Sequence, residues 1–443
     1  MAKVNRVYRE FKLILTSVAI TLVMVGLMVL FNLFLGHYYD LQNSFERTVY
    51  FIILIFTAII FARYAILLFL SMMAIIEKTA NKVSNVRYTK RRVTIIVPAY
   101  NEEMVIVQSL LSLKQQTYPN LEILVVDDGS TDRTYLKAKQ LEFERGQRRL
   151  VVYRKKNGGK AKAINYGIEK ATGELIVVVD ADSRLNREAV ELMVPYFEDP
   201  KIAAVAGSVY VVNQVNLLTK LQALEYIEGL NMVRAGQSFF KAVNIVPGPL
   251  GMFRKSALYD VGLYTDDTFA EDCDLTLRLL MKGYKVDYEF DAIAYTEAPE
   301  DLMSFIKQRY RWTRGILQAV MKHLKHLFNF RQPGLSIIIW YMLFEGILWP
   351  IADLLTNLFI IYQSATGVSI TLLYWFMIFG SMDMLTALYC VLITGESMAL
   401  VWWSIFYKLG FITLTNIFKI MATVEEFMGI EMGWGKLERK GRI

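Results

Sequence analysis

Long uncharged apolar runs lie near both ends of the chain and frame a middle region with a different pattern. Residues 13–35 contain no charged side chain. A helix of that length covers the roughly 30 Å hydrocarbon core of a bilayer at about 1.5 Å per residue. Comparable runs occupy residues 50–76, 335–362, 370–393 and 398–421. The pattern predicts two membrane-spanning helices before the middle region and about three apolar segments after it.

The middle region, residues 78–301, alternates short β-rich runs with helical stretches. The predicted strands are residues 93–98, 122–127, 150–154, 174–180 and 202–205. The predicted helices between them are residues 103–116, 132–140, 160–171 and 187–198. Strand–helix–strand alternation predicts an α/β domain with a doubly wound, mostly parallel sheet, which binds its ligands at the carboxyl ends of the strands.

The pattern divides the chain into five regions. Residues 1–77 form two N-terminal transmembrane helices, residues 78–301 the α/β domain and residues 335–421 the C-terminal transmembrane region. Residues 302–334 join the last two, and residues 422–443 form a basic tail. In the joining region, apolar and basic side chains fall on opposite helical faces. This favours a helix lying in the membrane interface, although a helix packed on a core has the same pattern.

Basic residues set the expected orientation. Four of them precede the first apolar run, which places the N-terminus and the α/β domain in the cytoplasm of a multi-pass protein of the inner or plasma membrane. Three full crossings after the domain would leave the basic tail outside. A re-entrant break at Lys408 and Gly410 would return it to the cytoplasm. Five straight crossings, with Lys408 paired to Asp383 or Asp353, are the alternative.

Composition narrows the class of protein. The chain has 443 residues, of which 54% are hydrophobic and 21% charged, so a purely soluble or disordered chain is excluded. A net charge of +7 fits an anionic membrane surface better than nucleic acid, which we do not expect as a partner. Cys273 and Cys390 form no motif and predict free thiols.

Two aspartates lie at the end of the predicted strand 174–180. Asp180 and Asp182 are two positions apart, so on a strand their carboxylates would point to the same side. Two carboxylates at the ligand edge of a sheet suit Mg²⁺ or Mn²⁺, which commonly takes substrate phosphates as further ligands. Capping aspartates are the alternative reading.

Polar residues also follow the other predicted strands. Tyr100 and Glu102 come after the first, Asp128 after the second, and Lys160 opens a helix after two glycines. Taken singly, each of these residues is also common in turns and helix caps. At one edge of a parallel sheet, however, a carboxylate can accept from a base or ribose, and glycines before a helix admit a phosphate.

Further along the chain, Glu271 and Asp272 precede a helical stretch, where acidic residues are stabilising by themselves. Gln308, Arg311 and Trp312 follow. Arginine suits a diphosphate, and tryptophan offers a flat apolar face to a sugar ring, although both also anchor helices at a membrane interface.

These clusters, in this order, resemble the membrane-embedded processive family 2 glycosyltransferases, which include hyaluronan, chitin-oligosaccharide, poly-N-acetylglucosamine and cellulose synthases. The resemblance runs from residue 93 through the C-terminal apolar segments and implies a GT-A-type domain between transmembrane helices. Its specificity lies in the ordered set Asp128, Asp180-x-Asp182, Glu271-Asp272 and Gln308-x-x-Arg311-Trp312.

The resemblance implies a role for each residue. Asp272 matches the general base, and Asp180 and Asp182 match the motif for Mg²⁺ or Mn²⁺. Binding of the UDP donor falls to Tyr100, Glu102, Asp128, Lys160, Asp180, Gln308, Arg311 and Trp312. Binding of the acceptor falls to Gly248, Pro249, Leu250, Glu271 and Trp312. The chain departs from the family at residues 247–251, where prolines and glycines replace serines, and at Ala270, where threonine is usual.

The implied function is processive, inverting β-glycosyl transfer from a UDP-sugar, first of all a UDP-N-acetylglucosamine type, at the cytoplasmic face. The growing polysaccharide would be the acceptor and would cross the membrane through the same chain. Membrane lipid and a small membrane partner subunit are further expected partners. The alternatives are a non-processive transferase acting on a lipid or lipid-linked acceptor, and a membrane scaffold that only binds nucleotides.

Overall fold

The computed structural model describes residues 44–82, 91–329, 332–365, 369–432 and 440–443, together with a few positions between 18 and 29. Most of the first predicted span, residues 13–35, lies outside the described residues.

The predicted parallel strands are present. They are β1 Val93–Ala99, β2 Leu121–Asp127, β4 Arg148–Arg154 and β5 Leu175–Val178, and they pair in parallel in the order β4, β2, β1, β5. Every residue of β1, β2 and β5 is buried, as the continuous apolar runs predict for strands covered on both faces. One detail was wrong: β5 ends at Val178, so Asp180 and Asp182 lie in the turn after the strand, not on it.

Antiparallel pairings extend this sheet at both edges. The described strands form one nine-stranded sheet in the order β3-β4-β2-β1-β5-β8-β7-β9-β6. β8 runs antiparallel to β5 and β7, whereas β7 and β9 are parallel. The remaining strands are β3 Phe143–Arg145, β6 Ser183–Leu185, β7 Ile202–Val211, β8 Gly251–Arg254 and β9 Lys285–Thr296, of which β7 contains the predicted strand 202–205. The fold is the expected mostly parallel, doubly wound type with a mixed outer half.

Helices cover both faces of the sheet and enclose two separate apolar cores. One core lies beneath α3 and α6, and the other beneath α5 and α10. These helices and their neighbours are α3 Ile106–Lys114, α4 Thr134–Lys139, α5 Lys160–Lys170, α6 Ala189–Met193, the 3₁₀-helix η1 Val194–Glu198, α9 Lys255–Asp260 and α10 Glu271–Met281. This arrangement leaves the carboxyl ends of the parallel strands open as the ligand edge.

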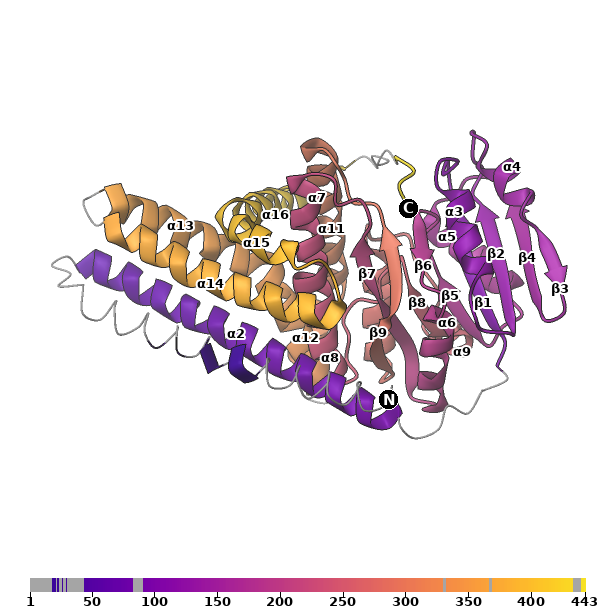
Figure 1. Ribbon diagram of the computed structural model, residues 1–443, viewed down its shortest axis with the longest axis horizontal. Helices are drawn as coiled ribbons and strands as arrows, with labels where there is room; N and C mark the ends of the chain where they lie inside the picture. The colour runs from indigo at the N-terminus through magenta and orange to yellow at the C-terminus, as the bar shows by residue number, and fades with distance from the viewer. Residues whose placement is uncertain are drawn as a thin grey trace.

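A layer of helices separates the sheet from the long apolar helices (Figure 1). It contains α7 Leu217–Leu224, the π-helix η2 Glu225–Met232, α8 Val233–Ser238, α11 Leu302–Lys322 and the 3₁₀-helix η3 Leu324–His326. Beyond it lie α2 Ser44–Lys82, α12 Pro333–Leu343, the π-helix η4 Phe344–Leu348, α13 Trp349–Ala365, α14 Ser369–Thr394, α15 Ala399–Phe406, the π-helix η5 Tyr407–Ile412 and α16 Thr413–Phe427.

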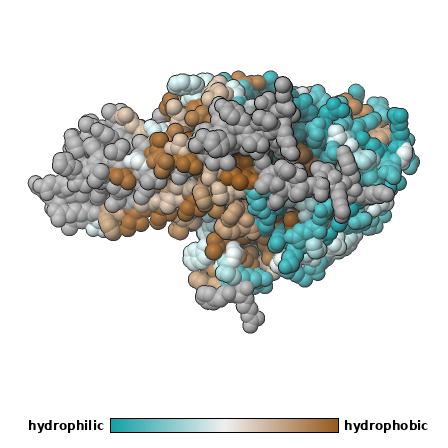
Figure 2. All heavy atoms as spheres, turned by 60° about the horizontal axis from the view of Figure 1, so that its bottom comes forward, coloured by the Kyte–Doolittle hydropathy of each residue, from teal (hydrophilic) through white to brown (hydrophobic). Residues whose placement is uncertain are grey.

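Two of the described helical stretches, Ala58–Lys78 and Pro333–Tyr362, are long and apolar enough to cross a membrane. A third candidate is the pair Ala399–Phe406 and Gly410–Phe427, which is bent by 58°. The bend falls at the predicted break, where Lys408 and Gly410 lie in the π-helix η5. Figure 2 shows hydrophobic side chains gathered over this helical half of the molecule and hydrophilic ones over the sheet.

The end of the basic tail contacts the α/β domain. The Lys440 backbone N–H donates to Glu297 at 2.9 Å, and Arg442 Nε lies 2.9 Å from a carboxylate oxygen of Glu300. Glu297 directly follows β9, and Figure 1 places the C-terminus near α3 and β6. The last four residues therefore lie on the same side of the apolar helices as the sheet.

Candidate active site

Asp128 stands at the end of β2 with its carboxylate held in one orientation. Its side chain is buried, and it accepts hydrogen bonds from Lys155 Nζ at 2.5 Å and from the backbone N–H groups of Gly158 and Gly159 at 3.1 and 2.8 Å. Sequence reasoning missed Lys155, which lies one residue past β4. The predicted acidic residue and the predicted glycines thus meet at the ligand edge.

Tyr100 and Glu102 lie in the turn after β1, next to the turn that carries Asp128. The two turns are joined because Asn101 N–H donates to Ser130 Oγ at 2.9 Å and Glu102 N–H donates to Thr134 Oγ1 at 2.7 Å. Tyr100 is exposed. Three of the predicted donor-binding residues therefore share one rigid corner of the sheet.

Lys160 connects two predicted acidic motifs. Its Nζ lies 2.8 Å from Asp180 Oδ1 and 3.1 Å from Glu271 Oε1. Gly248 lies against the same group, since a Cβ atom added there would be 2.8 Å from Asp180 Oδ2 and 3.0 Å from Lys160 Nζ. Four predicted residues from four different segments thus gather at one point, and a larger residue at position 248 would displace the ends of the paired Lys160 and Asp180 side chains.

Asp272 occupies the first turn of α10, beside this cluster. Burial of the carboxyl group, reinforced by the negative charge of Glu271, raises the pKa of Asp272 to about 6, while the Lys160 ammonium opposes the rise. Asp272 Oδ1 accepts from the Cys273 N–H at 2.8 Å. A fixed carboxylate with a pKa near neutrality can accept a proton and release it again, as general base catalysis requires.

Asp182 directly precedes β6, whose first residue, Ser183, pairs with Thr296 at the end of the neighbouring strand β9. It is 6% exposed. Among the described residues, no group of three or more His, Cys, Asp or Glu side chains could hold a metal ion by itself. Asp180 and Asp182 therefore suit a hard cation of the Mg²⁺ or Mn²⁺ type only if substrate phosphates and water complete its shell, as is common for Mg²⁺.

The predicted residues of α11 are organised by Arg309, which sequence reasoning did not single out. Arg309 Nε lies 3.1 Å from Glu225 of η2, and its guanidinium also donates to Gln308. The same guanidinium lies 4.3 Å from the centre of the Trp312 ring. The stacked cation fixes the orientation of the tryptophan. Arg311 lies on the same helix and is partly exposed.

The predicted acceptor loop is divided between surface and core. Gly248 and Pro249 are partly exposed beside the Lys160 cluster. Leu250 is completely buried, and a Cβ atom at Gly207 would lie 2.4 Å from its side chain. Its side chain therefore packs in the core, and Gly248 and Pro249 are the members of the loop that can face an acceptor.

The segment before Glu271 rests on α11 and, through it, on α16. Phe269 N–H donates to Gln318 Oε1 at 3.0 Å, and Gln318 Nε2 donates to Glu426 of α16 at 3.0 Å. Gly315 permits this approach, since a Cβ atom there would lie 2.6 Å from the Ala270 nitrogen. Helices α11 and α16 thus hold the N-terminus of α10, and with it Asp272, in position.

A chamber of about 270 Å³ lies between α11, η2 and the apolar helices. Arg234 and Asn244 line its sheet side, and Arg234 is close enough to Asp272 for their charges to interact. The described π-helical segments η2, η4 and η5 all contribute to its wall. Such widened turns recur at functional sites, so the convergence marks the chamber as part of the site.

Comparison with known proteins agrees with this fold. Residues 94–262 match the model of the family described as glycosyl transferase family 2. The poly-β-1,6-N-acetyl-D-glucosamine synthases of Staphylococcus aureus strain COL and of Staphylococcus epidermidis are each 30% identical to this chain. The alignments span 58% and 60% of this chain, but only 62% and 65% of the respective synthases.

A solved structure shares the fold. The mannosyltransferase from Pyrobaculum calidifontis, in complex with GDP-Man and Mn²⁺, aligns with a TM-score of 0.59 and 22% identity over 86% of this chain and 100% of that one. The fold and the matched segment include the sheet edge that carries Asp128, Lys160, Asp180 and Asp182. The chain therefore carries a glycosyl transferase family 2 domain over residues 94–262.

Proposed function

We propose that the protein is a processive, inverting β-glycosyltransferase that extends a polysaccharide from a UDP-sugar and passes it into the membrane. One observation carries the proposal: Arg234, which lines a chamber walled by the apolar helices, is close enough to Asp272 for their charges to interact. A transferase that releases its product into solution has no need of such a chamber. The 30% identical synthases, named for a polymer of N-acetylglucosamine, support a UDP-N-acetylglucosamine donor.

In the proposed reaction, the turns carrying Tyr100, Glu102 and Asp128 hold the nucleotide. Lys160 and Arg311 supply positive charge for the diphosphate. A divalent cation at Asp180 and Asp182, when bound, neutralises charge on the UDP leaving group. Metal dependence is also supported by the Mn²⁺ named for the mannosyltransferase of the same fold.

Asp272 takes the proton from the acceptor hydroxyl as that oxygen attacks the anomeric carbon and the bond to UDP breaks. Displacement from the opposite face inverts the α-linked donor to a β-linkage. Gly248, Pro249, Glu271 and Trp312 border the place where the acceptor end would lie. Because Lys160 contacts both Asp180 and Glu271, it links the donor and acceptor halves of the site.

The experiment for this function offers the purified protein a panel of UDP-sugars with Mg²⁺ or Mn²⁺ and analyses the product by mass and linkage. We expect a β-linked homopolymer from UDP-N-acetylglucosamine. A single sugar added to lipid would favour the non-processive alternative. Failure to turn over any nucleotide sugar would overturn the proposal in favour of a nucleotide-binding scaffold.

We further propose that the α/β domain and the C-terminal tail are both cytoplasmic. The contacts of Lys440 and Arg442 with Glu297 and Glu300, together with the bend of 58° in the last apolar segment, support this placement. A single cysteine near Lys440 should therefore resist a membrane-impermeant thiol reagent in intact cells and react after permeabilisation. Efficient labelling of intact cells would instead require five straight crossings.

A further inference from the structure

Glu228 is a buried carboxyl group in the wall of the chamber. It lies in the π-helix η2, its residue is 3% exposed, and neither carboxyl oxygen has a hydrogen-bond partner in the described part of the chain. Burying a polar group without a partner costs free energy of folding, so each such group in a native protein calls for an explanation.

The neighbouring acids of the chamber are paired, in contrast to Glu228. Glu225, one turn earlier in the same π-helix, binds Arg309. Glu345 of η4 binds Arg63 of α2. The charged group that acts on Glu228 is Asp383, which is also acidic and raises the pKa of Glu228 further above its ordinary value, in addition to the larger effect of burial. A carboxyl kept neutral in this way can donate one hydrogen bond and accept others.

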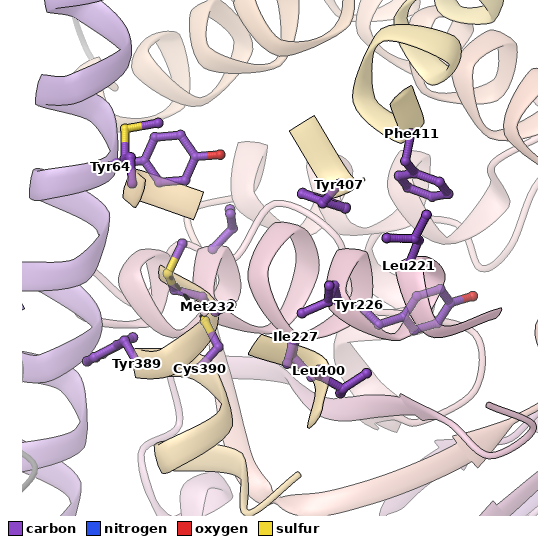
Figure 3. Close-up of a cluster of buried hydrophobic side chains, with 14 of the residues drawn as sticks. Tyr64, Leu221, Tyr226, Ile227, Met232, Tyr389, Cys390, Leu400, Tyr407 and Phe411 are labelled. Atoms are coloured by element: carbon purple, nitrogen blue, oxygen red, sulfur yellow. Dashed lines mark hydrogen bonds between the residues drawn. The ribbon is translucent and has the colours of Figure 1, made fainter. Parts of the chain in front are cut away.

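Aromatic rings surround this part of the wall. Tyr64 of α2, Trp312 of α11, Trp349 of α13 and Tyr407 of η5 all line the chamber. Figure 3 shows Tyr226 of η2 below Leu221 and Phe411, Ile227 of η2 beside Leu400, and Tyr64 extending from α2. Aromatic faces suit the apolar C–H faces of sugar rings, whereas sugar hydroxyl and amide groups need polar partners.

We propose that the Glu228 carboxyl binds the glycan product in the chamber, exchanging hydrogen bonds with hydroxyl or amide groups of the sugar units next to the growing end. This inference rests on the proposed function, since the chamber must receive a glycan. It explains why η2 keeps a carboxyl that the protein alone does not satisfy. An uncharged, hydroxyl-rich ligand matches this site, because a neutral carboxyl can both donate and accept hydrogen bonds.

The test compares two substitutions at the same position. Glu228→Leu removes every hydrogen bond from this side chain and should raise the midpoint of thermal unfolding, because the unsatisfied carboxyl is gone. With the glycan held less tightly, the mean product length should fall about fivefold, the effect of one net hydrogen bond. Glu228→Gln keeps donor and acceptor in the same shape and should preserve product length.

Glu396→Leu is the matched control. It makes the same change at a carboxylate outside the chamber, which is bonded to Gln214 Nε2 at 3.2 Å. In Glu396→Leu the mean product length should not change, and the midpoint of thermal unfolding should not rise. Wild-type product length in Glu228→Leu would overturn the inference, and so would a drop in unfolding midpoint with a parallel loss of UDP release. If the wild type itself makes no polymer, the proposed function fails together with this inference.

Discussion

Asp272→Asn is expected to abolish sugar transfer while UDP binding stays close to that of the wild type. The amide has nearly the shape of the carboxylate but cannot take the proton of the acceptor hydroxyl, and a positioned base contributes about 10²–10⁴-fold. Asp272 lies at the start of α10, in a segment held by Gln318, so the substitution should leave the backbone in place. The measurements are initial rates of polymer formation and calorimetric titration with UDP.

The pH profile gives a second readout of the same assignment. With a raised pKa of about 6, Asp272 is protonated and inactive as a base below that pH, so the wild-type rate should rise as pH increases through 6 and level off above it. In Asp272→Asn the residual rate should not rise with pH in this range. Retention of more than about a tenth of wild-type turnover would contradict the assignment, given the roughly 10²-fold minimum for a base.

Asp274→Asn provides a control on the same helix. Asp274 is completely buried and bonded to His323 at 2.8 Å and to Arg278 at 2.8 Å. These partners, with Lys322, hold the pKa of Asp274 well below its usual value despite burial, so its stabilising effect is present near neutral pH and is lost on acidification. The control variant should therefore unfold at lower temperature, but its transfer rate should still rise with pH as that of the wild type does.

The sequence predicted the parallel half of the sheet because that half consists of long apolar runs ended by polar turns. β1, β2 and β5 are buried along their whole length, so the pattern was unambiguous. It predicted the start of β7 but not the short outer strands β6 and β8. β6 has three residues and β8 four, and both depend on pairing with β9 or with β5 and β7, which come from distant parts of the chain.

The candidate site was predictable as a set of residues but not as a set of contacts. Asp180 and Asp182 were expected on a strand, because the apolar run continues to Val179, whereas pairing with β1 stops at Val178. Lys155 and Arg309 were missed because a lysine after a strand and an arginine on an amphipathic helix are common. Their roles follow from Asp128 and Trp312, which only the tertiary fold brings near.

The sequence pattern did not predict the π-helical turns in the wall of the chamber. η2, η4 and η5 continue ordinary helices, and one extra residue in a turn leaves the hydrophobic pattern nearly unchanged. Glu345 and Asp383 stand out in the sequence because they interrupt apolar runs, but Glu228 lies in the α/β region, where an acidic residue is common. Its significance comes from its burial without a partner.

Asp182→Ala is expected to remove the effect of a divalent cation on UDP binding. Wild-type affinity for UDP should rise when Mn²⁺ is added, whereas the variant should bind UDP weakly with or without the ion. The difference should be at least about tenfold, since even residues that merely support a metal ligand cost 10–100-fold in metal affinity. The reason is that Asp180 is already engaged with Lys160, which leaves Asp182 as the carboxylate of the pair outside that ion pair. Calorimetry with and without Mn²⁺ measures this directly and does not depend on turnover.

The competing explanation is that Asp182 only caps the turn between β5 and β6. Asp301→Ala tests what a cap costs, because Asp301 precedes α11 and accepts the Ser304 N–H at 2.8 Å. That variant should lose about 1 kcal/mol of folding free energy and keep its Mn²⁺-dependent UDP binding. If Asp182→Ala behaves in the same way, or if the wild type stays fully active in excess chelator, the aspartates after β5 are structural. If its unfolding midpoint is unchanged while the Mn²⁺ effect disappears, the carboxylate belongs to the donor site, because a cap cannot be removed without cost to the fold.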